Sequence, residues 1–408
     1  MSKIKVLHTA DIHIGIENYG YINPETGLNS RMEDFLRSFD IIIDYAIDND
    51  YDLVIFAGDA FKVQSPTSTQ QREFAKRVYR LSQAGIQTIL LAGNHDLSNK
   101  YGEATAMDVY GTLKIDNVYV CERPRSERIK TKNGDVQVIA IPYVSKSAFL
   151  TNEDYKLKTT EEVEKILIKK IDELINFYVM STISEDKNIP IILTFHAGVD
   201  NAKIGSEKDL LVGKTFSVPL SILAKKEIDY VALGHIHKHQ VLCHEPPVVY
   251  SGSIERVDFG EENEEKGFIT IELEKNNVTY QFNKLPAREF LTINIDVTES
   301  ETPNEDIINA IKKHDIKNKI IRLRYTILNT NTHVINEKEI KDLLSEAFFF
   351  MVRTIIADRG SRMRNPELNE TIIDDPIQSL EKYIILNPVI EDIKEDLLKR
   401  AKYVMNLA

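Results

Sequence analysis

The sequence predicts a layered α/β fold with a smaller unit toward its C-terminal end. Short apolar runs rich in β-branched residues recur through the first 285 residues, and apolar residues at helical three-and-four spacing separate several of them. Alternating elements of this kind are typical of sheets covered by helices. A third observation is that small polar clusters follow many of the apolar runs, which is where α/β proteins place their ligands.

The elements of this first part follow from these patterns in order. Apolar residues between Phe35 and Ile47 recur on one helical face, which predicts an amphipathic helix between the first two strands. Further helices are predicted over 68–84, where SPTSTQQ supplies capping residues, and over 160–179. Strands are predicted over 4–8, 53–57, 86–92, 136–141, 191–195, 230–233, 248–250, 267–273 and 278–282.

A change of pattern predicts a boundary between residues 1–285 and the rest of the chain. Residues 286–356 are expected to form a small α+β domain, because a strand, a helix, a strand, a helix and an apolar run follow one another there. The polar residues 357–374, punctuated by Gly and Pro, are typical of a linker. Residues 375–408 predict two short amphipathic helices, which either pack on their own domain or dock on a partner.

Composition excludes several classes of protein. The 408-residue chain is 42% hydrophobic and 28% charged, with 13 Pro and 17 Gly, so it is neither a disordered chain nor a collagen. Its two cysteines, Cys121 and Cys243, lie far apart, which argues against a disulfide framework and favours a reducing cytoplasm. No apolar run reaches the ~18 residues of a membrane span, and we expect neither secretion nor membrane insertion. The net charge of −12 predicts weak binding of polyanions by the isolated chain.

Five short motifs follow predicted strands and supply carboxylate, carboxamide and imidazole groups. Asp-x-His and Gly-Asp also occur in ordinary turns, whereas GNHD and GHIH rarely arise by chance. The carboxyl ends of strands form one crevice in an α/β sheet, so the motifs are expected to converge. Their residues are Asp11 and His13 in ADIH, Asp59 in FAGDAF, Asn94, His95 and Asp96 in AGNHD, His196 in TFHAG, and His235 and His237 in LGHIH.

The donor types in these motifs indicate a dinuclear metal centre. Oxygen and nitrogen donors together suit manganese, iron, zinc or cobalt, whereas magnesium sites rarely use several histidines. Two such ions about 3.5–4 Å apart can activate a bridging hydroxide and neutralise the attacking and leaving oxygens of a phosphoryl transfer. We assign Asp59 as the bridge through its two carboxylate oxygens. One ion is then completed by Asp11, His13 and His237, and the other by Asn94, His196 and His235.

His95 is surplus to coordination in this assignment. An imidazole titrates at about pH 6.5, so His95 is predicted to act as a general acid or to stabilise charge on the departing oxygen. Asp96 is predicted to orient His95 or, alternatively, to cap the following turn. The remaining histidines are expected to be structural, and they are His8, His239, His244, His314 and His333.

The five motifs, in this order, resemble the calcineurin-like metallophosphoesterase superfamily, and KVLHTADIHIG, GDAFKVQSP and YSGSIERVDFGEENEEKGF resemble its SbcD nuclease family. The resemblance implies a two-sheet α/β sandwich, a small capping domain and a helical C-terminal segment. It also implies a manganese-dependent nuclease of double-strand-break repair, with two manganese ions per chain. Such an enzyme degrades duplex DNA ends in the 3′ to 5′ direction and cleaves single strands and hairpins. Many SbcD relatives have Asp or His where Lys62 stands, which leaves the balance between exonuclease and endonuclease action open.

The same resemblance implies partners and a nucleoid-associated, cytoplasmic location. The helices of residues 375–408 are expected to bind the coiled-coil base of an SbcC-type ABC ATPase, and relatives form homodimers through helices after the second and third motifs. Core packing and a dimer surface explain the apolar residues of those helices equally well; they are Phe74, Val78, Met107, Val109 and Tyr110.

Two other functions remain open on sequence grounds. A phosphatase or cyclic-nucleotide phosphodiesterase acting on small substrates would share the metal centre, but the additional domains favour a polymer. A non-catalytic scaffold that tethers DNA ends would not need the complete ligand set. Basic runs at 123–132 and 353–364 are candidate DNA contacts, and the EENEE stretch at 261–265 is expected to form an acidic surface.

Overall fold

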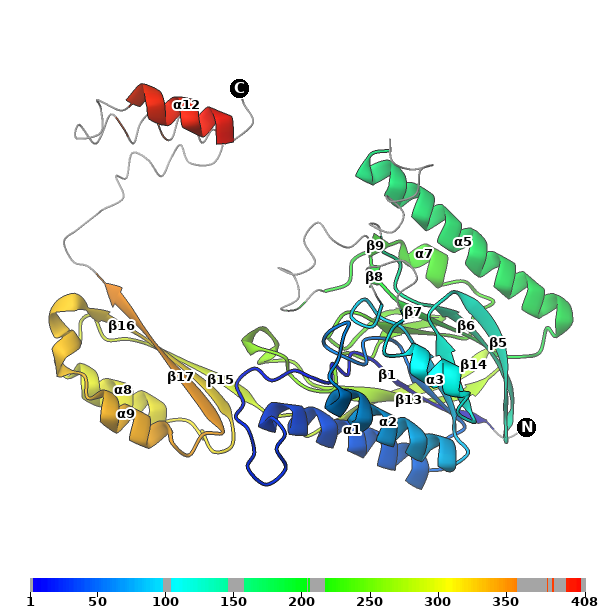
Figure 1. Cartoon of the computed structure of the whole chain (residues 1–408), viewed down its shortest axis with the longest axis horizontal. Coiled ribbons are helices and arrows are strands. Elements are labelled where there is room, and N and C mark those ends of the chain that lie inside the picture. The colour runs from blue at the N-terminus through cyan, green and yellow to red at the C-terminus, as the bar shows by residue number, and fades with distance from the viewer. Residues whose placement is uncertain are drawn as a thin grey trace. The chain divides into compact units, whose positions relative to one another are not determined.

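The structure is a computed structural model that describes residues 3–97, 104–145, 158–203, 205, 217–357, 380, 384 and 394–404 (Figure 1). The chain divides into two compact units. The first contains the residues up to 293 together with 315–323 and 344–351, and the second contains 294–314, 324–343 and the residues from 352 onward. All of the motif residues belong to the first unit.

The first of two six-stranded sheets contains the strands that precede three of the motifs. Its strands, in spatial order, are β14 (Asn277–Lys284), β13 (Gly267–Glu274), β1 (Ile4–Thr9), β2 (Leu53–Phe56), β3 (Gln87–Leu91) and β4 (Val118–Cys121). The four strands from β1 to β4 are parallel, so the segments that follow them leave the same edge of the sheet. On the other side β13 pairs antiparallel with β1, and β14 with β13.

The second sheet contains the strands that precede the other two motifs. Its strands, in spatial order, are β11 (Gln240–His244), β12 (Pro247–Tyr250), β10 (Tyr230–Gly234), β7 (Ile191–His196), β6 (Gly134–Ile141) and β5 (Arg125–Thr131). The four central strands are parallel, and the edge strands β11 and β5 are antiparallel to their neighbours. All strands predicted from apolar runs are present. The edge strands β4, β5 and β11 were not predicted, and the polar strand β5 (RSERIKT) buries a single side chain.

The two sheets pack face to face through apolar side chains such as Val6 of β1 and Ile192 of β7. His8 of β1 also lies in this interface, where its ring nitrogens are 3.1 Å from the hydroxyl of Tyr230 and 3.2 Å from the carbonyl oxygen of Leu233. Its complete burial lowers the pKa of His8 to about 3. The predicted α/β fold, a two-sheet sandwich, is therefore confirmed.

Helices cover both outer faces of the sandwich, with α1 and α2 on one side and α5 on the other (Figure 1). Their bounds are α1 Ser30–Asp48, α2 Ser68–Gln83, α3 Asp108–Leu113, α5 Thr160–Glu185 and α7 Leu220–Leu223. Both α2 and α5 begin with a capping box, in which Thr67 or Thr159 exchanges hydrogen bonds with the third helical residue. Within the described part of the chain, no helix combines the length and apolarity needed to cross a membrane.

A three-stranded sheet follows in the order β15 (Phe290–Asp296), β16 (Ile320–Leu328) and β17 (Phe349–Ala357), with helices α8 (Pro303–Lys312) and α9 (Glu337–Leu344) between the strands along the chain. This is the order of elements that the sequence predicts. Near the end of the chain α12 (Lys394–Val404) is helical. The predicted linker beyond residue 357 and most of the other residues of the predicted helical segment lie outside the described residues.

Candidate metal centre

The nine motif residues meet where strands of both sheets end. Asp11 and His13 follow β1, Asp59 follows β2, Asn94, His95 and Asp96 follow β3, His196 ends β7, and His235 and His237 follow β10. Seven of the nine are buried, whereas Asn94 and His95 are partly exposed. Among the nine, these two side chains are therefore the ones in contact with solvent.

Four of the predicted ligands have a backbone conformation that residues other than glycine rarely adopt. The φ angles are 52° at Asp11, 48° at His13, 55° at Asp59 and 99° at His235. Such a residue costs of the order of 1–3 kcal/mol and persists only where the surroundings hold it. Backbone hydrogen bonds of 3.0 Å do so here, from Asp11 N to Gly58 O and from His13 N to Asp59 O. Strain concentrated in one buried cluster is typical of a functional site.

Two motif glycines allow side chains to lie directly against the backbone. A Cβ atom on Gly58, where φ is +103°, would lie 2.0 Å from Nδ1 of His196. A Cβ atom on Gly93 would lie 2.1 Å from Oδ1 of Asp59. The glycines in GD and GNHD are thus required by the close approach of a predicted ligand.

The first group of predicted ligands contains Asp11, His13 and His237, each of which offers a donor atom within 4.8 Å of the others. Nε2 of His13 and Nε2 of His237 lie 2.8 Å apart. Two imidazole nitrogens that face each other at this distance can share a proton or bind the same cation.

The second group contains Asn94, His196 and His235. Oδ1 of Asn94 lies 3.1 Å from Nε2 of His196 and 2.9 Å from Nδ1 of His235. The other ring nitrogen of His196, Nδ1, lies 2.7 Å from the carbonyl oxygen of Ala57, to which it can only donate. In the neutral ring this hydrogen bond leaves the lone pair on Nε2 of His196, directed at the group.

Asp59 lies between the two groups. Its Oδ2 is 3.8 Å from Nε2 of His13 and 3.4 Å from Nε2 of His196. Its Oδ1 instead accepts the backbone N–H of His95 at 2.9 Å. Oδ2 is therefore directed at both groups, Oδ1 is held by the backbone, and the bridging role of Asp59 stays a prediction.

The charges of the cluster are set by burial and by one ion pair. Burial raises the pKa of Asp11 to about 6 and lowers the pKa of His235 to about 3. Burial also opposes the charge on His196, but the carboxylates of Asp59 and Asp11 raise the pKa of His196 to about 9. The pKa of Asp59 is held well below its usual range by His196, despite burial. Two carboxylates, one amide oxygen and four imidazoles thus fit borderline divalent cations, which would replace the proton on His196.

The catalytic candidates of the GNHD motif lie beside the first group. The ring of His95 is 5.2 Å from that of His13, and burial lowers the pKa of His95 while the charge of Lys62 acts in the same direction. The charge of Asp59 opposes this lowering of the pKa of His95.

The carboxylate of Asp96 has a structural role that neither sequence interpretation included. It accepts backbone N–H groups of Gly93 at 3.0 Å, Phe61 at 3.1 Å and Ala60 at 3.2 Å. Asp96 therefore ties the segment after β3 to the segment after β2.

Two residues at the site were not among the sequence candidates. The ring of Tyr143, which follows β6, lies 5.8 Å from that of His235 and 6.3 Å from that of His196. The strand-exit rule would have found it, because β6 neighbours β7. Oε1 of Glu261 lies 2.8 Å from Nδ1 of His237. The interpretation of EENEE as an acidic surface is wrong for Glu261 and Glu264, which are 0% and 9% exposed.

The basic run at 123–132 lies mainly on β5, where several of its charges are compensated. The pairs are Arg125 with Glu127, Arg128 with Asp135, and Lys132 with Asp50. Of the second run, Arg353 is exposed on β17, and Arg359, Arg362 and Arg364 lie outside the described residues.

The apolar residues considered for a dimer surface mostly belong to the core. Phe74, Val78, Met107 and Tyr110 are buried against α1 and the first sheet, whereas Val109 is 48% exposed. Core packing therefore explains four of the five, and the surface interpretation is wrong for them.

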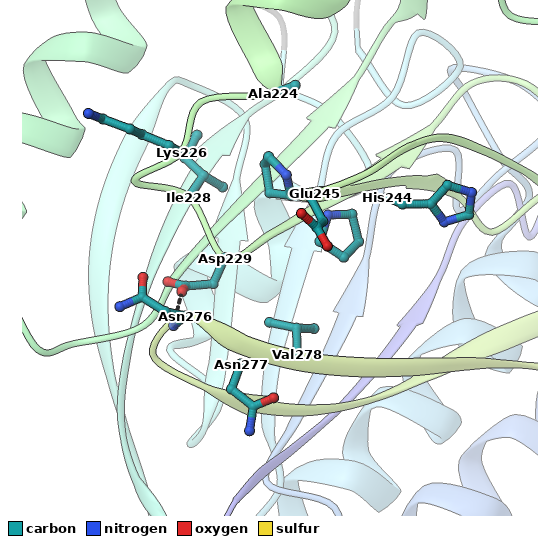
Figure 2. A pocket seen from close by; sticks show the side chains of 11 residues that line it. Ala224, Lys226, Ile228, Asp229, His244, Glu245, Asn276, Asn277 and Val278 are labelled. Carbon is teal, nitrogen blue, oxygen red and sulfur yellow. Dashed lines mark hydrogen bonds between the residues drawn. The ribbon is translucent and has the colours of Figure 1, made fainter.

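A pocket of about 640 Å³ lies at the opposite end of β10 from His235 (Figure 2). Its wall contains Asp229, directly before β10, and Asn276 from the turn between β13 and β14. The carboxylate of Asp229 accepts the backbone N–H of Asn276 at 2.6 Å and that of Ile191 at 2.7 Å. This carboxylate is used to join chain segments, and the pocket is separate from the metal centre.

The fold and the donor set define a class of enzyme. Residues 4–239, more than half of the chain, match the calcineurin-like phosphoesterase family. The chain belongs to that family, which accounts for metal-binding residue types at the strand ends of a two-sheet sandwich.

Within this class the chain is similar to nuclease subunits and to a DNA double-strand break repair protein. It is 25% identical to the SbcD subunit of nuclease SbcCD from Escherichia coli strain K12 over 301 residues, which cover 72% of this chain and 69% of that protein. It is 26% identical to the SbcD subunit of nuclease SbcCD from Staphylococcus epidermidis over 338 residues, 79% of each chain. It is also 26% identical to the DNA double-strand break repair protein Mre11 of Methanosarcina mazei over 345 residues, 84% of this chain and 48% of that protein. The resemblance to SbcD-type nucleases is confirmed.

Proposed function

We propose that the protein is the manganese-dependent nuclease subunit of a DNA double-strand-break repair complex. The observation that carries the proposal is the convergence of carboxylate, amide and imidazole donors around Asp59, with 2.8–3.8 Å between facing atoms. The similarity to SbcD and Mre11 proteins over 72–84% of the chain supports DNA as the substrate. The proposed reaction is hydrolysis of phosphodiesters, from the 3′ ends of duplexes and within single strands and hairpins.

The residues of the chain have distinct parts in this reaction. When bound, two manganese ions lower the pKa of water and neutralise charge on the phosphoryl oxygens. His95 N–H holds Oδ1 of Asp59, so that Oδ2 stays directed at both groups. The partly exposed imidazole of His95 donates a hydrogen bond or a proton to the departing oxygen. The ions would be held by Asp11, His13 and His237, by Asn94, His196 and His235, and by Asp59 between them.

The assembly is proposed on the same basis. Residues 286–356 act as a capping domain beside the nuclease domain of residues 1–285, and residues 357–374 form a linker. The helices of residues 375–408 dock on the coiled coil of an SbcC-type ATPase, and two copies of the nuclease chain associate. Because the net charge of the chain is −12, tight binding of DNA requires this assembly and the bound cations.

The direct test is digestion of end-labelled linear duplex DNA with manganese or magnesium, with and without the ATPase partner. We expect manganese-dependent shortening from the 3′ ends, which the partner accelerates. Hydrolysis of p-nitrophenyl phosphate without any cleavage of DNA would instead support an enzyme of small phosphate esters. Tight binding of DNA that stays intact with manganese and the partner would support a tethering scaffold and contradict the proposal.

A further inference from the structure

A buried charge cluster lies directly behind His237. The exposed fractions of its members are 0% for Glu261, 1% for Lys266 and 9% for Glu264. Nζ of Lys266 is 2.8 Å from Oε2 of Glu261, 2.9 Å from Oε2 of Glu264 and 3.1 Å from the carbonyl oxygen of His237. The cluster therefore contacts both the side chain and the backbone of a predicted ligand.

Stability alone does not explain a charge cluster in this place. Removing a carboxylate and an ammonium group from water costs several kcal/mol per ion, and well-packed apolar residues often replace such a pair without loss of stability. The contacts of Glu261 indicate another purpose. Its Oε2 forms an ion pair with Lys266 and accepts the backbone N–H of Val257 at 2.9 Å. Its Oε1 contacts Nδ1 of His237.

The hydrogen bond to Glu261 selects one form of the His237 ring. A carboxylate only accepts hydrogen bonds, so Nδ1 of His237 carries the hydrogen at 2.8 Å from Oε1. Nε2 of His237 then presents its lone pair to Nε2 of His13, 2.8 Å away. Among the described residues, Nδ1 of His13 is buried without a hydrogen-bond partner. Glu261 thus forms a hydrogen bond with one ring of this histidine pair, on the side facing away from the other ring.

The short turn that contains Glu261 is anchored on both sides. The ring of Phe259 packs on that of Phe290 at 4.9 Å and on that of Tyr19 at 5.4 Å. The carboxylate of Glu262 accepts the backbone N–H of Thr292 at 2.8 Å and its hydroxyl at 2.6 Å. A carboxylate held between two such anchors is preorganised for the His237 ring.

We propose that Glu261 is a positioning residue that fixes the orientation and tautomer of His237 and thereby strengthens ion binding by Asp11, His13 and His237. Lys266 holds Glu261 in its place. The proposal rests on the metal centre of the proposed function, and it is independent of the substrate. Loss of a carboxylate behind a metal-bound histidine typically weakens metal affinity 10–100-fold, which is the effect expected here.

The test compares Glu261→Gln with a matched control, Glu264→Gln. Both variants remove one carboxylate from Lys266, but only the first alters a group that contacts His237. The chelator-treated proteins are titrated with manganese, and calorimetry measures the binding. Wild type and E264Q should each bind two ions per chain. One of the two sites should be weakened about 10–100-fold in E261Q. Unchanged binding in E261Q, or equal weakening in both variants, would overturn the proposal.

A measurement on the wild-type protein keeps the proposal testable if E261Q does not fold. In ¹⁵N-histidine spectra of the metal-free protein, His237 should carry its hydrogen on Nδ1, and a hydrogen on Nε2 would overturn the assignment of Glu261. Wild-type protein that binds no manganese would overturn the metal centre itself and this proposal with it. Wild-type protein that binds two ions without cleaving DNA would contradict the proposed function alone.

Discussion

His8 makes the stability of the first unit depend on pH, and the size of the effect follows from its burial. Burial lowers the pKa of this side chain from 6.5 to about 3. Between these values the unfolded chain binds a proton that the folded chain does not, so stability falls as the pH decreases below 6.5. Each pH unit in this window corresponds to about 1.4 kcal/mol. From pH 7.5 to pH 5, His8 alone should lower the free energy of unfolding by about 2 kcal/mol.

The assay is urea unfolding of metal-free protein at the two pH values, followed by circular dichroism because the chain contains no tryptophan. Between pH 7.5 and pH 5 the free energy of unfolding should decrease by about 2 kcal/mol less in His8→Gln than in wild type. The other buried imidazoles contribute equally to both proteins. Replacement of the exposed His314 by Gln is the control and should leave the wild-type pH dependence unchanged. The same pH dependence in wild type and His8→Gln would refute the reasoning.

Three further predictions concern the metal centre. His95→Asn should keep about two ions per chain by elemental analysis while cleavage slows at least ~100-fold; loss of metal would show that His95 is a ligand. Gly93→Ala places a Cβ atom 2.1 Å from Oδ1 of Asp59, so manganese titration should show weakened binding, and wild-type affinity would contradict the close approach. Asp96→Asn places an amide donor among three backbone N–H groups, so the free energy of unfolding should decrease by about 1–3 kcal/mol in thermal unfolding. An unchanged melting temperature would contradict this prediction.

Much of the metal centre is predictable from local sequence, for a simple geometric reason. Buried parallel strands appear as short apolar runs, and their carboxyl ends necessarily meet at one edge of the sheet. Residues such as Asp11, Asn94 and His235 could therefore be grouped although they are far apart in the chain. Local pattern also explains why the helix that starts after Thr67 was expected, since the capping residues of SPTSTQQ act within one turn.

Other features were outside the reach of local patterns. The edge strand β5 has a polar sequence because its neighbours cover little of it, and its Arg128 pairs with Asp135 and Asp186 outside the strand. Phe74 and Met107 fit a core helix and a surface helix equally well until the opposing side chains are known. Glu261 belongs to an acidic stretch, and local composition does not show that it is the member of that stretch that contacts His237.

Local sequence thus specifies which elements form, which of their faces are buried, and which donor types arrive at the strand ends. It does so because hydrophobic periodicity and capping act between near neighbours. Packing of distant segments specifies the rest: that Oδ2 of Asp59 is directed at both ligand groups, and that Nε2 of His237 is directed at His13. These orientations depend on single hydrogen bonds, from His95 N–H and to Glu261, whose partners lie 36 and 24 residues away in the sequence. Chain segments that far apart acquire defined positions relative to each other only when the two sheets and the turn before β13 have packed.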